Sequence, residues 1–212
     1  MEFDKKPWLG SWDNFEGYIF SEESFLVQCW EEAENTARSG AAKLLFRKGV
    51  KAFWASACNT IVRYSRIRLG GWLVEECGEG IRITWFDEHH NELGAWEYEL
   101  DHMQNPFLEK KPGFVFIAKK AERDCPYACV IAMSPMEEEH HDGADVIPHL
   151  HFQFARKEKD LITLKKVKKK FWYATMCKGN SSLLEKCNIV RALHKLPLWE
   201  KLPENEQDKP GL

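Results

Sequence analysis

One face of the segment 22–40 carries apolar residues at helical spacing, and glutamates occupy much of the other face. The pattern predicts an amphipathic helix with Ser21 as its N-cap and Gly40 at its end. A second helix is predicted over residues 41–59. The side chains expected to be buried are Phe25, Leu26, Cys29, Trp30 and Ala33 in the first helix, and Leu44, Leu45, Phe53, Trp54 and Ala57 in the second.

The pattern changes at Thr60, where short aromatic and β-branched segments begin, separated by Gly, Pro, Asn and Asp. These segments are TIVRYSRIRL, IRITWFD, GAWEYEL, GFVFIAKK, YACVIAMS, HLHFQFA and KFWYAT. Such a series predicts an antiparallel meander or barrel. A last helix is expected over residues 181–196, stopped by Pro197. The fold class is therefore mainly β with helical additions.

Composition supports one globular domain over residues 1–212, with an aromatic core supplied by nine Trp and thirteen Phe. The net charge of −3 gives no reason to expect nucleic acid or an anionic membrane as partner. No apolar run has the length of a membrane span, so no membrane insertion is expected. The opening MEFDKKPWLGSW lacks the apolar core of a signal peptide, and we expect a cytoplasmic protein with its seven cysteines reduced.

Four of the eight histidines lie between residues 137 and 155. His149 and His151 are two apart on a predicted strand, so they share a face and lie about 7 Å apart along it. Leu150, Phe152 and Phe154 point the other way. Two imidazoles can converge on one zinc ion or a similar first-row metal, and a third ligand must come from elsewhere.

His140 or His141 can supply that third ligand, because the turn-forming residues 142–148 allow the chain to fold back onto the strand. The alternative is structural: a solvated strand face beside an exposed acidic loop. The spacing from His140 is His-x8-His-x-His.

A family resemblance favours the metal site. Gly10-Ser11-Trp12 is similar to the G-x-W that opens the first strand in the lipocalin and calycin superfamily. The order GSWDNFEGYI, FWASACNTIV, EYEL and PHLHFQF resembles the ZinT (YodA) family of bacterial zinc-binding calycins, over roughly residues 9–196. The resemblance implies an antiparallel calycin-like barrel with N-terminal helices and a C-terminal helix, and Trp12 packed at one end.

The same resemblance implies the ligand set His140, His149 and His151, and leaves His141 outside it. It implies Zn²⁺ as the ion, with Cd²⁺ or Ni²⁺ as alternatives at the same site, and a metal transporter component as partner. The given sequence departs from the family pattern in showing no recognisable signal peptide, no histidine in residues 1–20 and no clear counterparts of the disulfide cysteines.

For the other histidines, two of the cysteines and one basic run, structural roles are expected rather than metal binding. His89 and His90 are expected in a solvated hairpin turn, and His102 at the surface, with a role as fourth ligand as the alternative. Cys125 and Cys129 are expected to share a strand face and pack in the core. The basic run 165–170 is expected to be solvated, with RNA binding as the alternative.

Metal binding or trafficking therefore ranks first as the function. A small-molecule-binding calycin ranks second. A zinc hydrolase ranks third, because no carboxylate stands at a diagnostic spacing from the histidines, so no catalytic residue is assigned.

Overall fold

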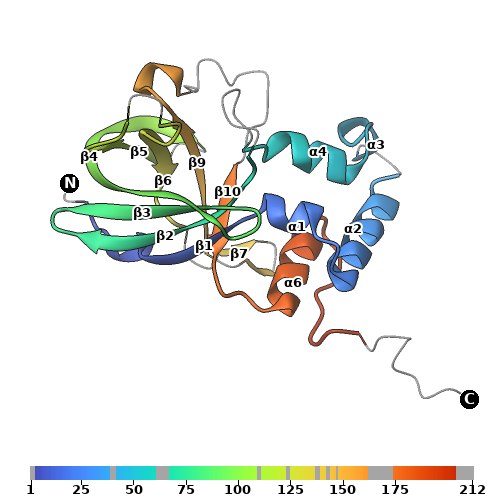
Figure 1. The fold of residues 1–212 in the computed structure, drawn as a ribbon. Helices are drawn as coiled ribbons and strands as arrows, with labels where there is room; N and C mark the ends of the chain where they lie inside the picture. Colours follow the sequence, from blue (N-terminus) through green and yellow to red (C-terminus); the bar gives the residue numbers. More distant parts are fainter. Residues whose placement is uncertain are drawn as a thin grey trace, which may run out of the picture.

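A computed structural model describes residues 3–38, 42–60, 67–108, 111–122, 125–136, 139–141, 144–146, 148–161 and 174–203. Eight strands in these ranges close into a barrel in the order β1-β10-β9-β6-β5-β4-β3-β2, and every ladder is antiparallel (Figure 1). The bounds are β1 Gly10–Asn14, β2 Leu69–Cys77, β3 Gly80–Asp87, β4 Glu92–Leu108, β5 Lys111–Ala118, β6 Cys129–Met133, β9 His149–Ala155 and β10 Thr175–Lys178. The predicted calycin-like barrel is confirmed.

Aromatic side chains fill the barrel interior. Trp12 is 1% exposed, donates from its indole Nε1 to the Trp8 carbonyl at 2.8 Å, and carries the Lys178 ammonium 4.7 Å above its ring. Trp12 is thus packed in the barrel as predicted. The same buried cluster contains Trp72, Trp85, Tyr98, Phe116, Leu150 and Phe152. In the described part of the barrel, the Trp72 ring packs against Trp85 and Phe152, and the Trp85 ring stacks on Tyr127.

Helices form a layer beside the barrel and bury a second apolar cluster (Figure 1). Its members lie on α1 Glu16–Phe20, α2 Ser24–Thr36, α4 Val50–Ala57 and α6 Leu183–Leu193, with α3 Ala42–Leu45 at the end of the layer. The outer face of β10 contributes Cys177 to this cluster. Short 3-10 turns, η1 Lys6–Trp8 and η2 Glu158–Asp160, complete the described helices.

Helix α2 forms where the apolar spacing predicts it, and Leu26, Cys29, Trp30 and Ala33 are its buried residues. Its cap is Glu23, whose carboxylate accepts from the Phe25 amide at 2.9 Å. The predicted cap, Ser21, lies two residues before Glu23, and its hydroxyl accepts from the Glu23 amide. The helix ends at Thr36, ahead of Gly40, so the prediction was wrong in its cap and end but right in its buried face.

The predicted single helix over 41–59 is wrong. Gly49 adopts a φ of +96°, which favours glycine and interrupts helical geometry, so the segment divides into α3 and α4. Ala57 is buried as expected, but Leu44 and Leu45 are 76% and 51% exposed. The spacing of these leucines fits a helical face that has no partner in the described structure.

Two strand regions differ from the sequence prediction. Strand β2 runs through LGGWLVEEC, of which the sequence predicted only Leu69 as strand. Strands β7 Glu139–His141 and β8 Ala144–Val146 pair in a separate antiparallel two-stranded sheet, which was not predicted. Helix α6 is confirmed, and Ser182 and Glu185 form a reciprocal capping box at its start. It ends at Leu193, before the predicted stop at Pro197. The basic run 165–170 and most of KFWYAT lie outside the described residues.

Cys125 and Cys129 are both buried, as expected for core residues. They do not share a face, because the chain turns between them before β6 begins at Cys129. Cys125 belongs to the cluster inside the barrel, whereas Cys129 belongs to a small cluster on the outer side of β5, β6 and β9. The shared-face prediction was wrong. All seven cysteines are free thiols.

Candidate functional site

Strand β9 places His149 and His151 on the outer face of the barrel. Leu150 and Phe152 between and after them are fully buried in the barrel core, which fixes the direction of the alternation. Both imidazoles are half-buried, with ring centroids 5.5 Å apart and an interplanar angle of 76°. The pair is therefore neither a core element nor a fully solvated face.

The neighbouring strand orients one of these rings. Thr175 pairs with His151 across the β9–β10 ladder, and its hydroxyl lies 2.9 Å from the His151 Nδ1. When that hydroxyl accepts from Nδ1–H, Nε2 carries the lone pair that a metal requires. His149 pairs with Cys177, whose thiol is buried, and burial raises the pKa of that thiol. A protonated thiol is a poor ligand, so imidazoles are the better donors here.

Met136, which precedes His140 by four residues, lies beside His149. Met136 forms an isolated bridge with His149, and the Met136 amide donates to the His149 carbonyl at 2.8 Å. His140 lies four residues later on β7, opposite Asp145 on β8. Its Cα is thus within roughly 14 Å of Met136, the span of four extended residues. The side chains of His140 and His141 lie outside the described residues. Among described side chains, no three His, Cys, Asp or Glu gather to hold a metal.

The other histidines lie elsewhere. His89 and His90 are exposed in the β3–β4 turn, where the Asp87 carboxylate accepts from the His89 and Asn91 amides at 2.8 Å. This confirms the predicted solvated turn. His102 is 43% exposed, with its Nδ1 2.7 Å from Asp101, as expected for a surface residue. His194 is packed in the helical layer and accepts from the Trp54 indole at 3.0 Å.

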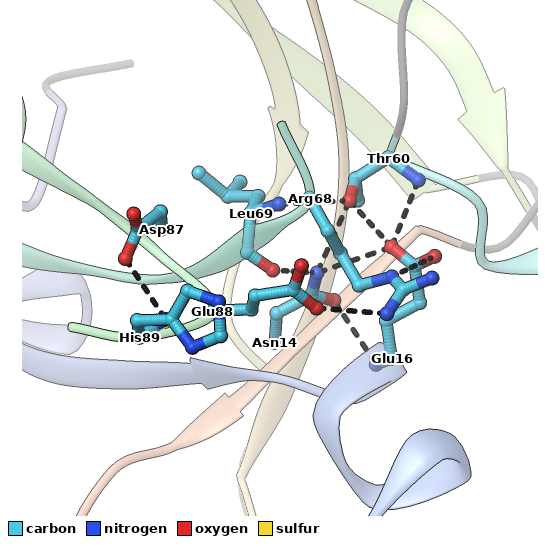
Figure 2. A network of polar contacts seen from close by, with 8 residues as sticks. All are labelled: Asn14, Glu16, Thr60, Arg68, Leu69, Asp87, Glu88 and His89. Atoms are coloured by element: carbon cyan, nitrogen blue, oxygen red, sulfur yellow. Dashed lines mark hydrogen bonds and ion pairs between the residues drawn. The ribbon is translucent and has the colours of Figure 1, made fainter. Parts of the chain in front are cut away.

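A buried carboxylate joins the helical layer to the barrel (Figure 2). Glu16, at the start of α1, is 2% exposed. Its Oε2 accepts from the Thr60 amide at 3.0 Å and from the Thr60 hydroxyl. Asn14 at the end of β1 donates to the same oxygen at 3.4 Å and to the Leu69 carbonyl at 2.6 Å. The network therefore links β1, α1, the segment that follows α4 and the start of β2.

Arg68 extends this network to the surface. Its Nε lies 3.4 Å from the Glu16 Oε1, and its Nη1 donates to the Glu88 carboxylate at 2.8 Å (Figure 2). The guanidinium also lies over the Phe20 ring, 3.9 Å from its centroid. The Glu16 carboxylate is occupied by these donors, so the network holds two parts of the fold together. Sequence reasoning missed it, and the only local signal is a glutamate between the apolar residues of NFEGYIF.

No family model, curated protein or solved structure matches the chain. None of the described helices is long and apolar enough to cross a membrane. The ZinT-like ligand set therefore stays a prediction that rests on the quoted motifs and on the geometry of β9.

Proposed function

We propose that the chain binds one divalent transition metal ion, zinc first, through His140, His149 and His151. The observation that carries the proposal is the pair of half-buried imidazoles on β9, with centroids 5.5 Å apart. Two nitrogens on rings so placed can reach one ion at about 2.0–2.1 Å after small rotations. The Thr175 hydroxyl at the His151 Nδ1 supplies the kind of outer contact that orients metal-binding imidazoles.

His140 completes the proposed set. The Met136–His149 bridge holds one end of the β7–β8 segment beside β9, and Pro148 brings the other end back to the same strand. The return of the chain to His149 on both sides of this segment supports His140 as the third ligand, because the His140 Cα lies within roughly 14 Å of Met136. Three neutral imidazoles favour Zn²⁺, with Cd²⁺ or Ni²⁺ as alternatives. A role in zinc homeostasis or transfer to a transporter component follows from the ZinT resemblance.

Zinc titration of protein without a histidine tag tests this proposal. We expect one zinc per chain, with affinity lost in the double variant His149→Ala/His151→Ala. The matched control is His89→Ala/His90→Ala, which removes two exposed imidazoles from the β3–β4 turn. The control should bind as the parent does. Equal binding by the β9 double variant and the parent would contradict the proposal.

The third ligand is tested by single variants. We expect His140→Ala to weaken zinc binding more than His141→Ala at about pH 7, where imidazoles are largely neutral. The difference should shrink at lower pH, because protonation of all three imidazoles competes with the metal. A larger loss in His141→Ala means that the ligand register is wrong by one residue.

A further inference from the structure

Two neighbouring leucines are exposed on α3. Leu44 is 76% exposed and Leu45 is 51% exposed, against an expectation of burial from their spacing. Helix α3 lies at the end of the helical layer, on the side away from the N-terminal end of the barrel (Figure 1). Single exposed apolar residues need no explanation, but adjacent leucines at a protruding corner form a contact surface.

Cationic side chains surround the leucines. Arg38, Lys43, Arg47 and Lys48 are exposed, and none of them makes an ion pair with a described residue. Three of them line a hollow of about 600 Å³ together with Leu44, Phe46, Ala37 and Glu34. The Glu34 carboxylate, the one acidic group of that lining, accepts from the Val50 amide at 2.6 Å. We call Arg38, Lys43, Leu44, Leu45, Arg47 and Lys48 the basic–leucine surface.

The stretch of sequence that contains this surface has basic residues but no acidic ones. Residues 35–74 hold eight Lys and Arg and no Asp or Glu, although the whole chain carries −3. Five of these eight, Arg38, Lys43, Arg47, Lys48 and Lys51, lie between the end of α2 and the first turn of α4, so the net charge conceals a local excess of cations there. Arg68 does not belong to this group, because it is paired with Glu16 and Glu88. An anionic partner is excluded by net charge only when the charges are evenly spread, and here they are not.

We propose that the basic–leucine surface docks the protein onto the surface of an anionic phospholipid bilayer. Exposed leucines can enter the boundary between headgroups and acyl chains, while the surrounding cations contact lipid phosphates. A second copy of the same surface would oppose four cations with four cations. Nucleic acid would satisfy the cations but leave the adjacent leucines in water. The combination of both features selects lipid, in a peripheral mode.

Co-sedimentation with vesicles tests the proposal. We expect the protein to bind vesicles of phosphatidylcholine mixed with phosphatidylserine, and to bind phosphatidylcholine alone much less. Binding should weaken as salt is raised. The variant Lys43→Glu/Arg47→Glu/Lys48→Glu should bind on the order of a hundredfold more weakly, since each basic residue contributes about fivefold at an anionic surface.

Two further variants distinguish a specific surface from general charge. Lys168→Glu/Lys169→Glu/Lys170→Glu changes the charge equally in the other basic run and should bind nearly as the parent does. Leu44→Ser/Leu45→Ser keeps every charge and should lose binding. Both leucines are exposed, so circular dichroism and melting should stay unchanged.

The proposal is overturned if the protein ignores phosphatidylserine, if both charge variants lose binding equally, or if the leucine variant binds as the parent does. It is also overturned if the leucine variant abolishes a concentration-dependent self-association while vesicle binding is absent, because the occupant is then a second copy of this chain.

Discussion

Removal of the Glu16 carboxylate should destabilise the protein more than any exposed charge change near it. In Glu16→Ala, the Thr60 amide and hydroxyl both lose their acceptor in a buried setting. Each unsatisfied buried donor costs about 1–3 kcal/mol. Asn14 keeps its bond to the Leu69 carbonyl and adds little to the loss.

The ion pair with Arg68 adds a smaller contribution, because the Arg68 side chain is 23% exposed and water can solvate it. The sum is a loss of roughly 3–5 kcal/mol in the free energy of unfolding, as for a buried pair that loses one partner. For a chain of this size that corresponds to a fall in melting temperature of roughly 10 °C. Urea unfolding followed by tryptophan fluorescence, with calorimetry, measures both quantities.

Glu88→Ala is the matched control. It removes the other carboxylate bonded to Arg68, at a residue whose side chain is 41% exposed, and should cost less than about 1 kcal/mol. Thr60→Val should fall between the two variants, and combined with Glu16→Ala it should cost less than the sum of the single changes. If Glu16→Ala is no more destabilising than Glu88→Ala, the junction network does not hold the helical layer to the barrel.

Three other outcomes follow from the burial or exposure of single polar side chains. Tyr98→Phe should cost about 1–3 kcal/mol in urea unfolding, because the Tyr98 hydroxyl accepts from the Trp85 indole at 3.0 Å and donates to the Tyr127 carbonyl at 2.8 Å; a neutral effect would mean that water replaces it. Burial lowers the pKa of His194 from 6.5 to about 4, so the unfolded chain takes up the proton first, and roughly 3 kcal/mol of stability should be lost as the pH falls from about 6.5 to 4. His194→Gln should flatten that part of the pH profile, and an unchanged slope would refute the assignment. Cys77 is half-exposed while the other six thiols are buried, so a thiol reagent should label one cysteine rapidly in the native protein. Cys77→Ser should remove that phase, and a second fast thiol would contradict the packing.

Regular local patterns predicted the parts of the fold that depend on one buried face. The α2 face and the alternation along β9 were read correctly, because spacing alone determines which side chains share a face. Strand β2 was missed because it contains Gly70 and Gly71, which weaken a strand pattern. Gly71 is there because a Cβ at this position would collide with the Trp12 carbonyl of the adjacent strand.

The parts of the site that arise from long-range contacts could not be predicted. Glu16 meets Thr60 44 residues later in the chain, and nothing local marks either residue as a partner. The exposure of Leu44 and Leu45 also depends on what the helical layer leaves uncovered. By contrast, the His149 and His151 pair needs only strand alternation, so the sequence places it correctly on one face.

The closure of the barrel by its first and last strands has a consequence for synthesis. β1 pairs with β10, and the Lys178 ammonium donates to the Leu9 carbonyl across 169 residues of chain. On the ribosome, β1 therefore emerges long before β10, the strand that pairs with its second edge. At typical translation rates the wait is on the order of ten seconds, during which the backbone groups of β1 on that side have no strand partner. An unpaired strand edge can pair with strands of other chains, so truncation just before β10 should leave this edge of β1 permanently open to such pairing.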